Sequence, residues 1–114
     1  MSAHDPRTLA PSKEATLAAF APLTGERFKL RAHSQTEAEA ELVAAAGLGF
    51  ATPAAKSGGK ESFRLLFQAP RNWALPQQVF HVTHEKHGDF GGMFLVPIRR
   101  DAKGVKLEAI FNLI

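Results

Sequence analysis

The sequence predicts a mainly β fold, either a small antiparallel barrel or a two-layer sandwich of about six strands, with one short N-terminal helix. Several short stretches alternate apolar and polar residues, as half-buried strands do. Clusters of Gly, Pro, Asn and Asp separate these stretches. The connections are short, so successive strands are expected to pair as hairpins. The length of 114 residues suits a single domain with one core. A flexible arm is expected over residues 1–11 and one β-rich domain over residues 12–114.

The N-terminal helix is predicted to run from an N-cap at Ser12 to Phe20. Leu17 and Phe20 are spaced to share one helical face. Pro22 is expected to end the helix, because the residue before a proline disfavours helical backbone angles.

The first strand is predicted where Phe28 and Leu30 alternate with three basic residues. Residues 36–46 are open to two interpretations. A capping box of Thr36 with Glu39 and a high alanine content favour a helix. A hairpin would place opposite charges on one face and apolar residues on the other, with Arg31 opposite Glu37, Lys29 opposite Glu39, Arg27 opposite Glu41, Leu30 opposite Ala38 and Phe28 opposite Ala40. The pairing favours a strand, and cross-strand contacts in the whole protein decide between the two.

The segment at 47–61 is rich in Gly, Pro and Ser and is expected to form a loop. It lacks the Gly-Lys-Ser/Thr ending of a phosphate-binding loop. Residues 62–69 form the clearest predicted strand, because Phe63, Leu65 and Phe67 alternate with polar residues.

Three further strands are predicted over residues 78–84, 88–100 and 105–114. In the second of these, alternation places one set of residues on a common face: Phe90, Gly92, Phe94, Val96 and Ile98. The pair Gly91-Gly92 suggests a bulge, a bend or a close backbone approach. Pro97 cannot donate to a β-ladder and is expected at an edge or a bulge. Gly104 suits a positive φ in the last hairpin loop, and the closing strand is expected to point Val105, Leu107, Ala109 and Phe111 inward.

His81, His84 and His87 raise the question of a metal site. Zinc needs three or four ligands that converge at roughly 2 Å. Along a continuous strand, residues three apart point to opposite faces. The segment therefore reads better as two strands joined by a bend, and the sequence predicts no metal site, no cofactor and no catalytic residue.

The composition excludes several classes of function. There is no cysteine, so disulfides, thiolate metal sites and cysteine nucleophiles are absent. No apolar signal-peptide region and no membrane-length apolar run are found, which indicates synthesis in the cytoplasm with an undefined final location. The net charge of +3 comes from dispersed basic residues, which indicates a mildly cationic surface.

Motifs in the C-terminal two-thirds of the chain resemble a family of small bacterial β-rich proteins of unknown function. They are "GERF", "SFRLLFQAP", "LPQ", a strand that ends in His84, "FLVP" and "EAIFN". The resemblance covers about residues 20–112 and includes only His84 of the three histidines. It implies a compact β domain without known catalysis, often encoded near proteins similar to phage tail-collar fibres. The longer N-terminal arm and the acidic, alanine-rich strand depart from the family pattern.

These observations favour a non-enzymatic protein-interaction or structural module, an accessory or subunit of a phage-tail-like or fibrous assembly. Self-association or a protein partner, such as a tail-collar-like fibre protein, is expected, and the candidate contact residues are Trp73, Pro97, Arg99 and Arg100. One alternative is a small basic nucleic-acid-binding barrel that uses Arg99, Arg100 and Lys103. The other is a metal- or ligand-binding enzyme that uses the three histidines.

Overall fold

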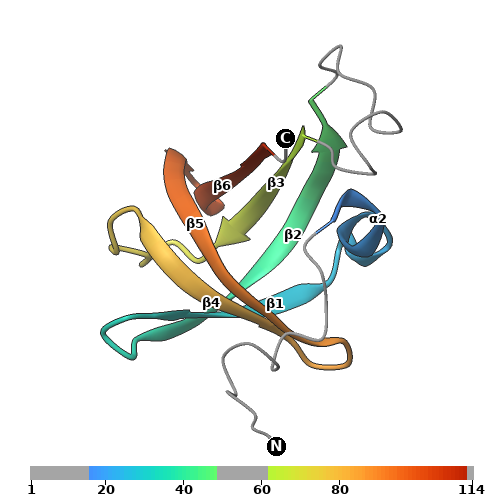
Figure 1. Ribbon diagram of the computed structural model, residues 1–114. Coiled ribbons are helices and arrows are strands. Elements are labelled where there is room, and N and C mark those ends of the chain that lie inside the picture. The colour runs from blue at the N-terminus through green and yellow to red at the C-terminus, as the bar shows by residue number, and fades with distance from the viewer. Residues whose placement is uncertain (1–15, 49–61, 113–114) are drawn as a thin grey trace, which may run out of the picture.

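The computed structural model describes residues 16–48 and 62–112 as a closed antiparallel barrel of six strands with one short helix (Figure 1). Around the barrel the strands follow the order β1-β2-β3-β6-β5-β4, and β4 closes onto β1. This confirms the barrel rather than the sandwich. The predicted Ser12 cap, the arm over residues 1–11 and residues 49–61 of the loop predicted over 47–61 lie outside the described residues. The assignment of Gly47 to that loop is wrong, because Gly47 pairs with Phe63 at the end of the second strand. The strands are β1 (Arg27–Ala32), β2 (Glu37–Gly47), β3 (Ser62–Ala69), β4 (Gln78–His84), β5 (Gly88–Asp101) and β6 (Gly104–Asn112).

Helix α2 (Leu17–Phe20) begins after Thr16, whose side-chain Oγ1 accepts the backbone N–H of Ala19 at 3.1 Å. It passes into a single 3₁₀ turn, η1 (Ala21–Leu23), which contains the proline expected to end the α-helix. The helix packs beside β2 (Figure 1) and inserts Phe20 into the barrel. The Phe20 ring lies 4.6 Å from Phe90 between centroids, so the helix seals one end of the core.

The segment open to two interpretations is a strand. The register of β1 against β2 is the predicted one, from Arg27 opposite Glu41 to Arg31 opposite Glu37. The ion pair formed is a diagonal one, Arg27 Nη1 to Glu39 Oε1 at 3.6 Å. Both side chains are largely exposed, so this contact adds little stability, and the charges mainly fix the register.

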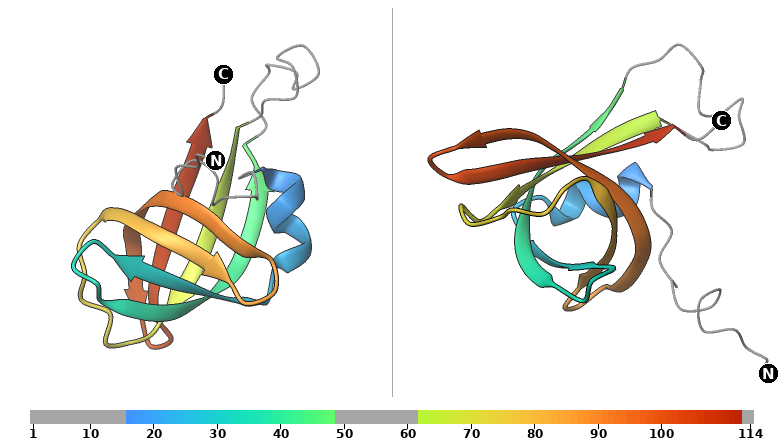
Figure 2. Two further views of the ribbon diagram at one scale, coloured as in Figure 1. Left: turned by 60° about the horizontal axis from the view of Figure 1, so that its bottom comes forward. Right: turned by 90° about the vertical axis from the view of Figure 1, so that its left-hand side faces the viewer.

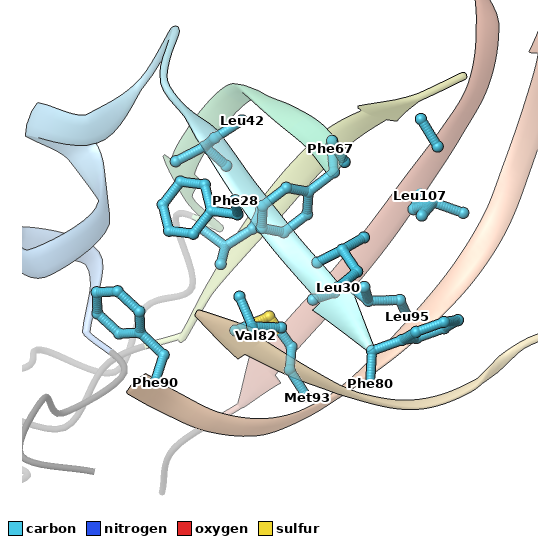
Figure 3. Close-up of a cluster of buried hydrophobic side chains, with 14 of the residues drawn as sticks. Phe28, Leu30, Leu42, Phe67, Phe80, Val82, Phe90, Met93, Leu95 and Leu107 are labelled. Carbon is cyan, nitrogen blue, oxygen red and sulfur yellow. The ribbon is translucent and has the colours of Figure 1, made fainter. Parts of the chain in front are cut away.

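The barrel is filled by the inward residues of all six strands (Figure 3). Phe28 lies at the centre of an aromatic group and meets Phe67 edge-on at a centroid distance of 5.6 Å. In the predicted strand β3, Phe63, Leu65 and Phe67 are fully buried. The inward set therefore supplies a single core in which His84 is the one buried polar side chain of the described residues.

A bulge in β5 corrects the predicted face of that strand. Val82 pairs with Gly91 and Thr83 pairs with Asp89, so Phe90 is an extra residue. Gly91 adopts φ +83°, as the glycine pair suggested. Because the extra residue shifts the alternation by one, Phe90 points inward while Phe94 points outward and is 50% exposed.

The C-terminal end of β5 and the N-terminal end of β6 form a hairpin that projects beyond the barrel (Figure 2). Leu95 pairs with Gln78, the first residue of β4, so the residues of β5 after Leu95 lie beyond β4. Among the described strands, this part of β5 pairs only with β6. A second bulge follows Pro97, between it and Arg99, which confirms the edge-or-bulge prediction. Gly104 has φ +135° in the hairpin turn, as predicted.

Candidate functional site

His84 is the last residue of β4 and is buried at the end of the barrel. Its Nδ1 accepts the backbone N–H groups of Lys86 at 3.0 Å and His87 at 3.1 Å. The proton of the neutral ring is therefore on Nε2, which donates to Glu26 Oε1 at 2.6 Å. Since both ring nitrogens are engaged, this histidine holds the β4–β5 turn and has no free nitrogen for a metal or a substrate.

The other two histidines lie in different surroundings. His81 is on the outer face of β4, and its Nε2 lies 2.7 Å from Asp89 Oδ1, which also accepts the N–H of Gly91. His87 is exposed in the turn, with its ring 4.9 Å from that of His84. Within the described ranges, no three His, Cys, Asp or Glu side chains are grouped so that they could hold a metal ion.

Two of the predicted contact residues fasten the loop before β4. The indole of Trp73 is 5% exposed, donates from Nε1 to the Leu75 carbonyl at 3.1 Å, and packs against Phe80. The Arg100 guanidinium donates to the carbonyl oxygens of Arg71 at 3.1 Å and Trp73 at 2.7 Å. Trp73 therefore covers the edge of the core and is not an exposed surface anchor. Arg100 lies in the part of β5 that has no partner in β4, and its side chain binds the loop before β4.

The remaining predicted contact residues lie on the projecting hairpin. Pro97 is partly buried beside the bulge, and Arg99 is exposed with its Nε 3.7 Å from Asp101 Oδ2. The backbone N–H of Lys103, together with the charges of Lys106 and Arg99, holds the pKa of the Asp101 carboxyl below its usual range. A proline, a bulge and arginines are devices that protect a strand edge from pairing with another chain. The hairpin edge is thus an unfavourable place for strand addition.

Two parts of the outer surface of the barrel differ in the character of their side chains. On β1 and β2 the outward positions hold three basic and three acidic side chains. On β4 and β5 they include Val79 and Phe94, which are cross-strand partners and are 56% and 50% exposed. We call these two side chains the Val79–Phe94 pair. Exposed apolar neighbours of this kind mark contact surfaces more often than single exposed residues do.

A groove of about 410 Å³ runs from this pair across β4 to β1. We call it the basic groove. Its basic side chains are Arg31, His33 and His81, and its neutral carboxamides are Gln35 and Gln78. Val79 lines it beside Gly92, where a Cβ would come within 3.1 Å of Val79 Cγ1. Among the described residues no carboxylate lines this groove, whereas glutamates line the neighbouring hollows at the β1–β2 side of the barrel.

The sequence alone reveals neither the exposure of Phe94 nor the basic groove. The glycine pair signalled a bulge, but the resulting change of side for Phe94 depends on which residue is the extra one. The basic groove combines β1 with β4, two strands separated by half the chain, so no local pattern reveals it.

Comparison with known proteins adds a family. The model of a domain of unknown function, DUF6916, matches residues 15–111. Searches of curated proteins and of solved structures found no match. In the part of the chain that the structure describes, no helix is long and apolar enough to cross a membrane.

Proposed function

We propose that this chain, which belongs to the DUF6916 family, is a protein-interaction module that contacts its partner through the outer face of β4 and β5. The carrying observation is the Val79–Phe94 pair. Two apolar side chains, each at least half exposed, lie together on a barrel whose neighbouring sector is charged. Aromatic and aliphatic side chains in such positions are typical centres of protein interfaces.

The state of the basic residues supports a protein partner over a nucleic acid. Arg100 is bonded to two backbone carbonyls, Arg99 is paired with Asp101, and the Lys106 ammonium donates to Gln68 Oε1 at 2.7 Å. Nucleic-acid binders instead present clustered, available cations along one face. The candidate residues on the projecting hairpin are largely occupied within the chain.

The histidines support a non-enzymatic role. A general base needs a nitrogen lone pair aimed at a substrate. His84 uses its lone pair on the backbone of the β4–β5 turn and is therefore a structural element of that turn. His81 contacts Asp89 through Nε2 on the outer face of the sheet.

The resemblance described above implies a finer form of the proposal, in which the partner is a tail-collar-like fibre protein of a phage-tail-like assembly. We also propose synthesis in the cytoplasm, as the sequence composition indicates. The partner proposal rests on the resemblance, and identification of the partner tests it.

The test places a photo-crosslinking p-benzoylphenylalanine at position 94 of the full chain, expressed in the source organism. We expect a discrete protein adduct that mass spectrometry identifies, or a crosslinked dimer if the partner is a second copy. The same chain with Val79→Asp is expected to lose that adduct, because a charge replaces half of the apolar pair.

The matched control carries the crosslinker at Lys29, an outward position on the charged sector. An adduct of the same protein with equal yield from Lys29 indicates nonspecific contact and contradicts the proposal. The proposal is also wrong if position 94 gives no adduct while the variant chain remains folded.

A further inference from the structure

We infer that the basic groove selects a partner segment in extended conformation that carries an apolar side chain and a carboxylate two residues apart. This inference rests on the proposed function, because it names the chemistry of the partner at the same face. It follows from the charges that line the groove and from the spacing of two residues on neighbouring strands.

The charge argument starts at Arg31. This arginine is exposed on β1, and no ion pair joins it to any carboxylate of the described chain, although Glu37 is its cross-strand neighbour in register. The other charged or titratable groups of the groove are His33 and His81. A groove with an available guanidinium and no lining carboxylate is complementary to an anionic side chain.

Two carboxylates near the groove are engaged with other residues. Asp89 is turned to His81 and to the N–H of Gly91, both within 2.7 Å of its Oδ1. Glu39, on the next outward row of β2, is paired with Arg27. Asp89 and Glu39 are therefore bonded to other residues, and Glu37 forms no ion pair with Arg31 in the structure.

The spacing argument comes from the barrel register. Arg31 is the Cα partner of His81, so Val79, two residues along β4, is its diagonal neighbour on the outer face. Diagonal neighbours in an antiparallel pair have Cβ atoms roughly 7–8 Å apart. In an extended peptide, residues i and i+2 point the same way and are roughly 7 Å apart. A segment with an apolar residue at i and Asp or Glu at i+2 can therefore meet Val79 and Arg31 together.

Continuity with the Val79–Phe94 pair favours a protein segment over a small anion. Val79 belongs both to the groove and to the pair, and Phe94 extends the apolar contact on the next strand. Gly92 presents no side chain, which lets Val79 Cγ1 lie close against β5 at this junction. An apolar side chain of the partner can pack on the exposed surfaces of Val79 and Phe94, whereas a free carboxylate would use only the cationic end of the groove.

The test uses two end-blocked pentapeptides as probes, Ser-Leu-Ser-Glu-Ser and its neutral counterpart Ser-Leu-Ser-Gln-Ser. Each is titrated to millimolar concentration into the ¹⁵N-labelled full chain at low ionic strength, where exposed charges are least screened. We expect shifts of the Gly92 and His81 amide signals. The acidic peptide is expected to bind about threefold tighter, the gain that one solvent-exposed ion pair provides.

Three variants separate the contributions. Arg31→Gln is expected to abolish the preference for the acidic peptide while the neutral peptide binds as before. Lys29→Gln removes the same charge from the same face of β1 outside the groove, and it is expected to keep the preference. Val79→Asp is expected to weaken both peptides. All three positions are exposed, so a retained amide spectrum is expected in each case.

The outcomes distinguish this inference from the proposed function. Equal binding of both peptides, lost on Val79→Asp, overturns the acidic partner and leaves the interaction face in place. Equal loss of preference in the Arg31 and Lys29 variants shows a general charge effect and also overturns the inference. The inference is also overturned if free N-acetylglutamate gives the same amide shifts as the acidic peptide. It is overturned as well if no amide signal of β4 or β5 shifts with either peptide. The crosslinking at position 94 then decides the proposed function separately.

Discussion

Replacing His84 with phenylalanine tests whether the backbone bonds accepted by this ring hold the β4–β5 turn. The variant keeps an aromatic ring next to Phe28, whose centroid lies 5.0 Å from that of the histidine. It removes the acceptor for the N–H groups of Lys86 and His87 and the donor to Glu26. The ring packing is thus largely conserved while three hydrogen bonds are lost.

The expected cost follows from these three bonds. Each neutral hydrogen bond contributes about 0.5–1.5 kcal/mol, with the lower end applying where water can replace the partner. The Glu26 side chain is 48% exposed, so its contact with Nε2 adds less than about 1 kcal/mol. We expect a loss of about 2 kcal/mol in the free energy of unfolding, which corresponds to a fall of roughly 8 °C in Tm.

Urea unfolding followed by the fluorescence of Trp73 measures this loss, because the single tryptophan is buried and becomes exposed on unfolding. Glu26→Ala is the matched control and is expected to cost less than about 1 kcal/mol, since it leaves both bonds to Nδ1 intact. If the two variants lose the same stability, the backbone bonds contribute nothing beyond the Glu26 contact. A His84→Phe variant as stable as the wild type refutes the reasoning altogether.

Three further predictions concern two glycines with positive φ, two phenylalanines of different burial, and the carboxylate of the hairpin. Gly104→Ala places a Cβ against the carbonyl oxygen of Ala69 and should cost more than about 3 kcal/mol, whereas Gly91→Ala, also at positive φ but in open space, should cost about 1–2 kcal/mol by thermal unfolding. Phe67→Ala should cost about 3–5 kcal/mol, and Phe94→Ala should stay within about 0.5 kcal/mol of the wild type in urea. Because the pKa of Asp101 is lowered in the fold, its carboxylate stabilises the protein above about pH 4 and loses this effect as the pH falls further. The Tm difference between the wild type and Asp101→Asn should therefore shrink between pH 7 and pH 3, and an unchanged difference would contradict the assigned pKa shift.

Much of the fold could be predicted because its signals are local. Alternation identifies β3, and turn chemistry identifies the positive φ of Gly104. The register of β1 against β2 could also be predicted, because opposite charges and small apolar residues agree on a single alignment. The choice of barrel over sandwich could not, since closure depends on β1 pairing with β4, two segments about 50 residues apart.

The candidate site was less predictable because its residues look alike in sequence but differ in contacts. Trp73 and Arg100 have the residue types of interface anchors, yet the indole packs on Phe80 and the guanidinium binds loop carbonyls. Arg31 has the same alternating context as Arg27, but only Arg27 forms an ion pair among the described residues. Composition and period carry no information about which of two equivalent cations is left available.

The bulge at Gly91 links the core to the proposed interaction face. Without the extra residue, regular alternation from Phe90 would send Phe94 inward and expose Met93 and Leu95. With it, Phe90 meets Phe20 under the helix, Met93 and Leu95 fill the barrel, and Phe94 is left outside beside Val79. The glycine that lets β5 bend into the barrel thus also exposes the aromatic side chain on which the interaction face depends. The surface is consequently a product of the closure of the barrel and cannot be removed by a register shift without disrupting the core.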